Sequence, residues 1–401
     1  MQNLDALFDL IPLAGIDMPV CLAIALPGRR LRTLPSFPQA ALPQNGRMAC
    51  GRGFSADTCK ASAFGEAAEL ASCCAWGDEP MVTATEAELG PAALAPEALN
   101  GWSKAQIKGR TKWNAQYGGF DWRPGSRDRQ RPIDWILVEN AHGGPSAYAP
   151  ADFAFIGRRQ AGDPDAVAIG DSNGCAAGPT IETAKLAAIL ELVERDATGR
   201  WWYGRLGRAP VDIASLTIEA GLLVWLNARN RRTWLFDITT DIGIPVFAAA
   251  SAEQGGRDVA LGFAARIEPR SAAIAALSEM LQMEVSLNAA RAMGEAAGNW
   301  TQWRAKVSLA TPPLDGASKL APGPIQVSRL PQASSELAVA LEACARNSID
   351  LHFSDMTRPE IGVPAIRALS AALCHYKPRF DRKRLIAGTG GGNIKQIPLL
   401  I

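Results

Sequence analysis

Three segments of the chain place two oxygen-bearing side chains three residues apart, each time with small residues four and seven positions before the first of them. The pairs are Glu66 with Glu69, Glu191 with Glu194, and Glu279 with Gln282. On a helix, the two members of a pair lie on one narrow face with the positions four and seven residues before the first acid. Those earlier positions carry only small side chains, so a bulky ligand can lie against each face. Three such faces predict a site for a hard cation with a charged ligand, such as Mg²⁺ with a polyphosphate.

Acids spaced in this way are also common on solvated helix faces, where they bind nothing. That alternative is the simpler explanation of any one pair. The same pattern occurs three times, however, inside segments that are otherwise apolar. The repetition therefore favours a shared binding site over three unrelated surface pairs.

The elements that must position these pairs alternate along the chain. Apolar runs predict strands at residues 19–26, 47–53, 133–139, 244–250, 258–265, 348–353 and 363–370. Helices are predicted at about 56–76, from Thr180 towards Trp202, from Pro269 onward, and at 335–346. Ser55 or Asp57 is expected to cap the first of them. Each acid pair falls on one of the first three helices.

This order of elements predicts a mixed α/β (α+β) fold. No shift in composition marks a linker, so we expect one domain over residues 1–401, built from repeated strand–turn–helix units. Residues 84–130 and 308–330 are expected to be the least ordered, the second because several prolines lie among Gly, Ser and Ala. Trp201 and Trp202 are interpreted as packing residues.

Composition excludes several classes of protein. The 401 residues include 41 basic and 40 acidic side chains, so no general field attracts nucleic acid or an anionic membrane. The basic runs at 229–232 and 379–384 are interpreted as solvated surface. Eight scattered cysteines without a CxxC pair indicate reduced thiols in a cytoplasm. Neither a signal peptide nor an apolar stretch of about 20 residues is found, so a soluble protein is expected.

Common nucleotide and hydrolase motifs are missing from the sequence. There is no G-x-x-x-x-G-K-[ST] loop, and the glycine run at 388–392 is interpreted as a flexible segment. No G-x-S-x-G elbow occurs, and the three histidines (His142, His352 and His375) are not spaced as zinc ligands. A nucleotide would therefore have to bind at an unusual, acid-rich site.

Four motifs, in order, make the sequence resemble the YcaO family from about residue 15 to residue 384. The first is Gly51-Arg52-Gly53 followed by Ser62, Glu66 and Glu69. The second is Ser172-Asn173-Gly174-Cys175-Ala176-Ala177-Gly178 followed by Glu191-Leu-Val-Glu194-Arg195-Asp196. The third is Glu279 with Gln282, and the fourth joins Asp355-Met-Thr357 to Ile361-Gly-Val-Pro364-Ala-Ile-Arg367.

The resemblance implies an enzyme that binds ATP and Mg²⁺ on helix carboxylates. In many YcaO proteins, a Cys, Ser or Thr side chain of the substrate peptide attacks the neighbouring backbone amide. The enzyme phosphorylates the amide oxygen with ATP, and loss of phosphate from the peptide leaves an azoline ring. Relatives make thioamides or amidines instead. In such phosphoryl transfer the protein contributes mainly positioning and charge neutralisation.

The resemblance also implies a role for each matching residue. The metal ligands would be Glu66, Glu69, Glu191, Glu194 and Glu279. The cofactor-binding residues would be Arg52, Ser62, Asn173, Gln282 and Arg195, with a structural ion pair as the alternative for Arg195. The catalytic residues would be Glu66, Glu191 and Arg367.

The sequence departs from the family pattern at several positions. Leu70 replaces the usual arginine, Arg52 stands where lysine is common, and Glu284 stands where a basic residue often occurs. The lost positive charges suggest weaker ATP binding. The end of the chain, residues 396–401, has one proline where azoline-forming members often have a proline-alternating tail. That end is expected either to organise the site or to dock on the protein's own core or a partner.

These features predict an ATP-dependent cyclodehydratase that acts on a ribosomally made precursor peptide. A thioamide- or amidine-forming enzyme and a non-catalytic regulatory subunit remain as alternatives. A chain of this length is expected to lack a fused leader-binding domain. The expected partners are therefore the precursor peptide, a separate E1-like leader-binding protein and, for azole products, a flavin-dependent dehydrogenase. A homo- or hetero-oligomer is expected.

Overall fold

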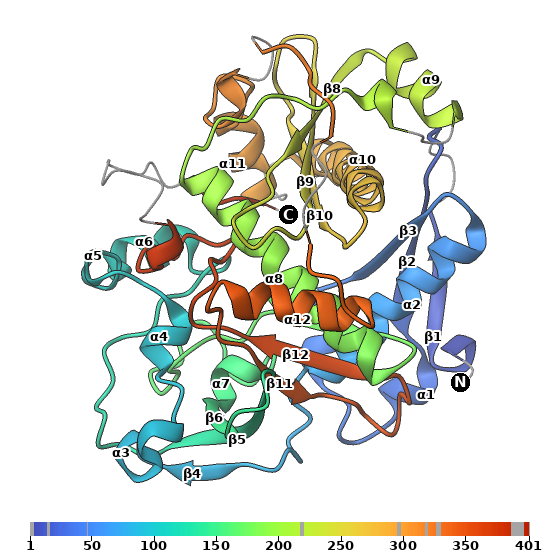
Figure 1. Cartoon of the computed structure of the whole chain (residues 1–401). Coiled ribbons are helices and arrows are strands. Elements are labelled where there is room, and N and C mark those ends of the chain that lie inside the picture. The colour runs from blue at the N-terminus through green and yellow to red at the C-terminus, as the bar shows by residue number, and fades with distance from the viewer. Residues whose placement is uncertain are drawn as a thin grey trace.

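Helix α8 (Ile181–Tyr203) crosses the middle of the molecule, and sheets lie on either side of it (Figure 1). The computed structural model describes residues 4–13, 17–45, 47–216, 220–294, 298–316, 320–325, 330–385 and 397–400. The glycine run at 388–392 lies outside the described residues, as do residues 15 and 16, where the resemblance begins.

The chain alternates strands and helices, as predicted. The further helices are α1 (Arg29–Arg32), α2 (Ala56–Cys73), α3 (Glu86–Leu89), α4 (Pro96–Asn100), α5 (Lys104–Lys108), α6 (Arg110–Tyr117), α7 (Ala151–Ala154), α9 (Ala220–Ala228), α10 (Pro269–Met293), α11 (Asn299–Lys306) and α12 (Glu336–Arg346). The strands are β1 (Phe8–Pro12), β2 (Cys21–Pro27), β3 (Ala49–Gly53), β4 (Val82–Ala84), β5 (Ile133–Asn140), β6 (Ala147–Pro150), β7 (Cys175–Ala177), β8 (Arg231–Asp237), β9 (Val246–Glu253), β10 (Ala260–Ala265), β11 (His352–Asp355) and β12 (Ala365–Leu369).

The named strands of the described residues form three sheets. One has the order β1-β2-β3, the second β10-β9-β8, and the third β4-β5-β11-β12-β7 with β6 also paired to β5. Every pairing within these sheets is antiparallel. Helix α2 covers β1-β2-β3, α10 covers β10-β9-β8, and α8 packs on β12 and β7 (Figure 1). The mixed α/β class predicted from the sequence is confirmed.

Two apolar cores hold these layers together. The larger is built around α8, α10 and the strands β8 to β10, and the smaller lies between α2, the first sheet and β5. Trp201 and Trp202 belong to the larger core, where Trp201 meets Phe236 and Phe263 and Trp202 stacks on Trp303. Their interpretation as packing residues is confirmed.

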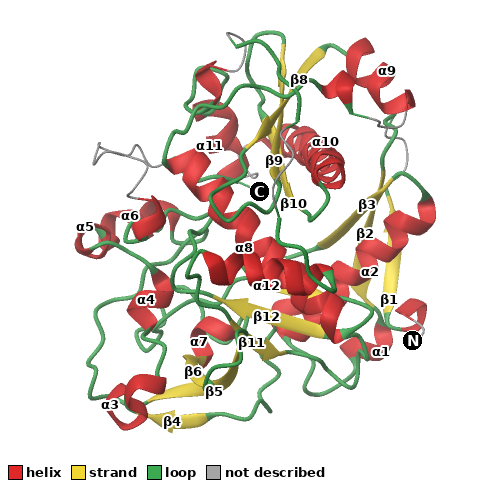
Figure 2. Cartoon of the chain, viewed as in Figure 1, coloured by secondary structure: helices red, strands yellow, loops and turns green. Residues whose placement is uncertain are grey.

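The segment 84–130 is more ordered than predicted. It contains the short helices α3 to α6, although loops still connect them (Figure 2). Thr85 and Ser103 form capping boxes at the starts of α3 and α5. Trp102 and Trp113 are buried. The longest of these helices has eight residues, too few for an apolar period to stand out in the sequence.

The interpretation of the two basic runs as solvated surface is wrong for most of their arginines, although Arg232 and Lys383 are exposed. Arg229 and Arg231 point inward and pair with the buried carboxylate of Glu284. In the second run, Arg379 pairs with Asp121 and Arg384 with Asp196, and both acids are buried. These arginines are held inside the protein because acids far away in the sequence pair with them. A run of basic residues does not by itself indicate that such distant partners exist.

The described part of the tail docks on the protein's own core. The carbonyl of Ile397 accepts a hydrogen bond from Nε1 of Trp202 at 3.0 Å, and the amide of Leu399 donates to the Tyr203 hydroxyl at 3.2 Å. Leu399 is fully buried and Leu400 is nearly so. Of the two expectations for the tail, docking on the protein's own core is the one that these contacts support.

Candidate functional site

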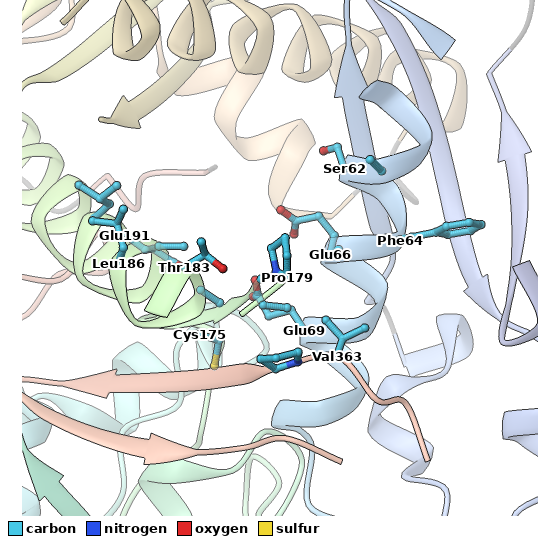
Figure 3. Close-up of a pocket in the computed structure, with 18 of the residues that line it drawn as sticks. Ser62, Phe64, Glu66, Glu69, Cys175, Pro179, Thr183, Leu186, Glu191 and Val363 are labelled. Atoms are coloured by element: carbon cyan, nitrogen blue, oxygen red, sulfur yellow. The ribbon is translucent and has the colours of Figure 1, made fainter. Parts of the chain in front are cut away.

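A cavity of about 880 Å³ lies between α2, α8 and α10. Nine of the predicted site residues line it: Arg52, Ser62, Glu66, Glu69, Glu191, Glu194, Arg195, Glu279 and Gln282. Figure 3 shows α2 with Ser62, Glu66 and Glu69 on one side of the cavity and α8 with Thr183, Leu186 and Glu191 on the other. The structure thus brings the three acid pairs together, although they come from segments far apart in the sequence.

Each acid helix begins at a defined cap. Ser55 forms a capping box with Thr58 at the start of α2, and Thr180 forms one with Thr183 at the start of α8. Glu268 caps α10, and Pro269 occupies the first turn, where its missing N–H costs nothing. A fixed start sets the rotation of each helix, and with it the direction in which the acids point.

Glycines let each acid helix press against the backbone in front of it. A Cβ on Gly51 of β3 would lie 2.0 Å from the backbone nitrogen of Ala63 in α2. One on Gly178 would lie 2.6 Å from the Thr183 hydroxyl oxygen in α8, and one on Gly262 of β10 would lie 2.1 Å from the Met280 nitrogen in α10. Only glycine allows such approaches, so these positions set how closely the acid pairs converge.

Burial and mutual repulsion raise the pKa values of the clustered acids. Burial raises the pKa of Glu194 to about 7, although Arg195 opposes this. Burial, together with repulsion from Glu66 and Glu191, raises the pKa of Glu69 well above its usual range. Glu66 faces the open cavity and meets water there, yet the surrounding walls also raise its pKa. The cluster therefore gains from any cation that enters it.

Two arginines partly compensate these acids. Arg195 lies 3.1 Å from Glu194 and 3.5 Å from Glu191, and it rests over the ring of Tyr376. Arg52 donates to Gln282 at 3.0 Å and to Glu279 at 3.1 Å. The predicted structural ion pair of Arg195 is thus present, on the wall of the same cavity. Its buried Nε has no hydrogen-bond partner among the described residues, which leaves a donor for a ligand.

Two predicted residues do not line the cavity. Arg367 is fully buried on β12, where it donates to the backbone carbonyl of Asp171 and lies 3.5 Å from the Cys175 sulfur. Asn173 donates its backbone N–H to the Asp171 carboxylate, and its own buried side-chain oxygen lacks a partner in the described part of the chain. A direct contact of either residue with a nucleotide stays a prediction.

Of the departures from the family pattern, Arg52 lines the cavity, whereas Leu70 and Glu284 lie away from it. Leu70 packs against the smaller core, and Glu284 is buried on the other side of α10 with Arg229 and Arg231. Neither residue lines the cavity. Weaker ATP binding through a lost charge at these two positions, as expected from the sequence, therefore has no direct basis in this geometry.

Sequence reasoning missed one cation at the site. Arg266 lines the cavity at the end of β10, is exposed, and is paired with no carboxylate of the described residues. Its attraction opposes the raised pKa of Glu194. It belongs to no motif, but its position between a predicted strand and the helix-starting Pro269 was a usable signal.

The residues present fit Mg²⁺ bound together with a phosphorylated ligand. Within the described ranges, no three His, Cys, Asp or Glu side chains are arranged to hold a metal ion by themselves. Mg²⁺ rarely uses such an all-protein cage, and usually binds one or two carboxylates plus phosphate oxygens and water. Acid pairs beside Arg52, Arg195 and Arg266 provide for both the ion and the phosphates.

Comparison with known proteins decides the family. The model of the YcaO cyclodehydratase family, described as ATP- and Mg²⁺-binding, matches residues 50–374. This chain belongs to the YcaO family. ATP and Mg²⁺ are the cofactors in that family's description, in agreement with the prediction.

Solved structures agree with this assignment. A heterocyclase in complex with substrate and cofactor is 28% identical, with a TM-score of 0.84 over 98% of this chain and 54% of that one. The heterocyclase TruD is 30% identical, with a TM-score of 0.69 over 81% of this chain and 47% of that one. The chain thus spans about half the length of these heterocyclases.

A more distant structure shares the fold alone. YcaO from Methanopyrus kandleri, bound with AMPPCP and Mg²⁺, is 18% identical, with a TM-score of 0.62 over 98% of this chain and 91% of that one.

No helix within the described ranges has the length and apolar character that crossing a bilayer requires.

Proposed function

We propose that this YcaO chain is an ATP-dependent cyclodehydratase that forms azoline rings from Cys, Ser or Thr residues of a ribosomally made precursor peptide. The observation that carries the proposal is the convergence of three acid pairs with Arg52, Arg195 and Arg266 on one large cavity. The likeness to two heterocyclases at 28% and 30% identity supports the choice of reaction.

Mg²⁺ and ATP, when bound, would supply a phosphoryl group for the peptide amide oxygen. The chain's own residues would position the reactants and balance charge. Burial raises the pKa values of Glu69, Glu191 and Glu194, which favours their protonated forms in the nucleotide-free protein, and these carboxyl groups would hold the cation in their deprotonated forms. Arg195 keeps its charge between these acids and would stabilise negative charge on the phosphates.

Glu66 is the best placed of the acids to meet a peptide. It faces the open part of the cavity, and burial raises its pKa, so it is the acid that we assign to proton transfer with a bound peptide. Ser62 lies one helical turn earlier on the same face and accepts the backbone N–H of Arg52 at 3.3 Å. The proposed roles are therefore proton transfer for Glu66 and nucleotide contact for Ser62.

The same site would also serve a thioamide- or amidine-forming enzyme, since these reactions share the activation step and differ in the attacking group. A regulatory subunit is disfavoured because all six acid and amide positions are retained around one cavity. We propose a precursor peptide and a leader-binding protein as partners, with a dehydrogenase where azoles are made. A cytoplasmic location stays a prediction of the sequence.

The first experiment measures thermal stability with Mg²⁺ and ATP. Binding to the folded state should raise the melting temperature of the wild type. Glu191→Gln and Glu66→Gln should abolish this rise and leave the nucleotide-free melting temperature close to that of the wild type or above it. A wild type that is not stabilised by millimolar Mg-ATP would count against the enzyme and for the regulatory subunit.

The second experiment identifies the product. The chain is combined with the leader-binding protein and the precursor peptide that are encoded next to it in the genome, and the peptide is analysed by mass spectrometry. Loss of one water per modified residue indicates azolines, and exchange of oxygen for sulfur indicates a thioamide. The chain alone should release phosphate slowly. Rapid modification of a leaderless peptide by the isolated chain would contradict the expected partner.

A further inference from the structure

Arg52 contacts the third acid pair with both ends of its guanidinium group. Nη1 donates to Gln282 Oε1 at 3.0 Å, and Nη2 donates to Glu279 Oε2 at 3.1 Å. These are the oxygens that α10 would offer to a metal ion. A cation is thus already present at this pair, and it is a side chain of the protein.

The backbone around Arg52 is fixed, so this contact is built into the fold. Gly51 and Gly53 press β3 against α2, and a Cβ at Gly53 would lie 2.3 Å from the Thr58 hydroxyl oxygen. The Arg52 N–H donates to Ser62, which locks the strand to the same helix. The guanidinium group and its partner carboxylate are only about one-fifth exposed. An ion pair held in this way competes effectively with a dissolved ion.

The pair is also close to the acids of the other two helices. The positive charge of Arg52 opposes the raised pKa values of both Glu66 and Glu194. The ion pair of Arg52 itself is with Glu279 of α10. Arginine suits this position better than lysine, because its planar fork reaches Gln282 and Glu279 at once.

We propose that Arg52 stands in for the metal ion in the nucleotide-free protein and excludes free Mg²⁺ from Glu279 until a phosphate group draws the arginine away. This inference rests on the proposed function, because it assumes that ATP and Mg²⁺ bind in this cavity. ATP then provides both the anion that takes Arg52 and phosphate oxygens for the ion. The protein would bind metal only together with nucleotide, and its acid cluster would not hold a free cation between turnovers.

The test measures metal binding without nucleotide, with Mn²⁺ as a spectroscopic substitute for Mg²⁺ and the free ion followed by electron paramagnetic resonance. The wild type should bind Mn²⁺ weakly. Arg52→Met should bind it about tenfold more tightly or better, the factor expected when one hydrogen bond between charged groups no longer competes. Arg346→Met serves as the control, since it removes an exposed ion pair with Glu342 on α12. It should behave like the wild type.

A double variant assigns the gain to the proposed contact. Arg52→Met combined with Glu279→Gln should lose most of the tighter binding, because the released ligand is then missing. Equal Mn²⁺ affinity of wild type and Arg52→Met, or a gain that persists in the double variant, would overturn the proposal. Should Arg52→Met fail to fold, Arg52→Gln removes the charge and keeps a polar contact with Gln282.

The outcome is distinguishable from failure of the proposed function. Stabilisation of the wild type by Mg-ATP tests the nucleotide site and does not depend on the resting position of Arg52. If Mg-ATP stabilises the wild type and Arg52→Met gains no metal affinity, only the counter-ion role is wrong. If Mg-ATP does not stabilise the wild type, the proposed function fails first.

Discussion

Glu194 should make the nucleotide-free protein less stable as the pH rises. Its carboxyl is buried on α8, and its pKa is raised from 4.5 to about 7. An acid whose pKa is higher in the folded state favours folding below pH 4.5. That contribution is lost as the pH rises towards 7. At about 1.4 kcal/mol per pKa unit, the loss amounts to roughly 3 kcal/mol.

Glu194→Gln isolates this effect. Glutamine stays neutral and keeps an acceptor for the Ala265 amide, which lies 3.3 Å from the carboxylate. In nucleotide-free protein, the variant and the wild type should have similar free energies of unfolding at pH 4.5. The variant should be more stable by up to about 3 kcal/mol at pH 8. Urea denaturation at the two pH values measures both, and Glu342→Gln on the exposed side of α12 is the control.

The sign of the difference decides the matter. If the ion pair with Arg195, at 3.1 Å, outweighed the cost of burial, Glu194→Gln would instead be less stable at pH 8 than the wild type. That result would refute the argument. Saturating Mg-ATP at pH 8 should reverse the order, because the wild type gains a ligand that the variant binds poorly.

Three further predictions concern residues around the site. Leu399→Ala should lower the free energy of unfolding by about 2–5 kcal/mol in denaturation experiments, because the tail packs on the core. Stabilisation by Mg-ATP should persist. Loss of cyclisation activity in a folded variant would instead indicate a catalytic role for the tail. Glu284→Ala should cost up to about 3–5 kcal/mol by leaving the mostly buried Arg229 and Arg231 without their acid, with little change in ATP affinity by calorimetry. Gly51→Ala should reduce Mg-ATP stabilisation more than Gly255→Ala, which has open space, because its Cβ forces β3 away from α2.

The acid pairs and their helices could be predicted because their signals are local. Helical spacing, the caps at Ser55 and Thr180 and the proline at 269 are all contained in one element. The family motifs then indicated that the pairs share a site. These are the features that determine single helices.

The long-range contacts that complete the site could not be predicted from such local sequence signals. Arg52 meets Glu279 across 227 residues of sequence, and its motif says nothing about that partner. From the sequence, Glu284 was expected to replace a basic residue near the nucleotide. It lies instead on the side of α10 that faces away from the cavity. Whether a charge lies on the surface or in a buried pair depends on which segment the fold brings against it, and residue type does not encode that.

The buried ion pairs of the carboxyl-terminal segment also set the order in which the protein can be completed. Arg379 pairs with Asp121 across 258 residues, Lys377 lies 2.9 Å from Asp171, and Arg384 pairs with the fully buried Asp196 of α8. Until residues 377–384 have left the ribosome, Asp121 lacks Arg379, and Asp171 and Asp196 keep only the longer ion pairs with Arg367 at 3.7 Å and Arg200 at 3.8 Å, so burying these acids is costly. We therefore expect the helix that carries Glu191 and Glu194 to reach its final packing only after residues 377–384 have been made. A chain that stops before residue 377 should therefore contain the acids of the site without the ion pairs that fix the packing around them.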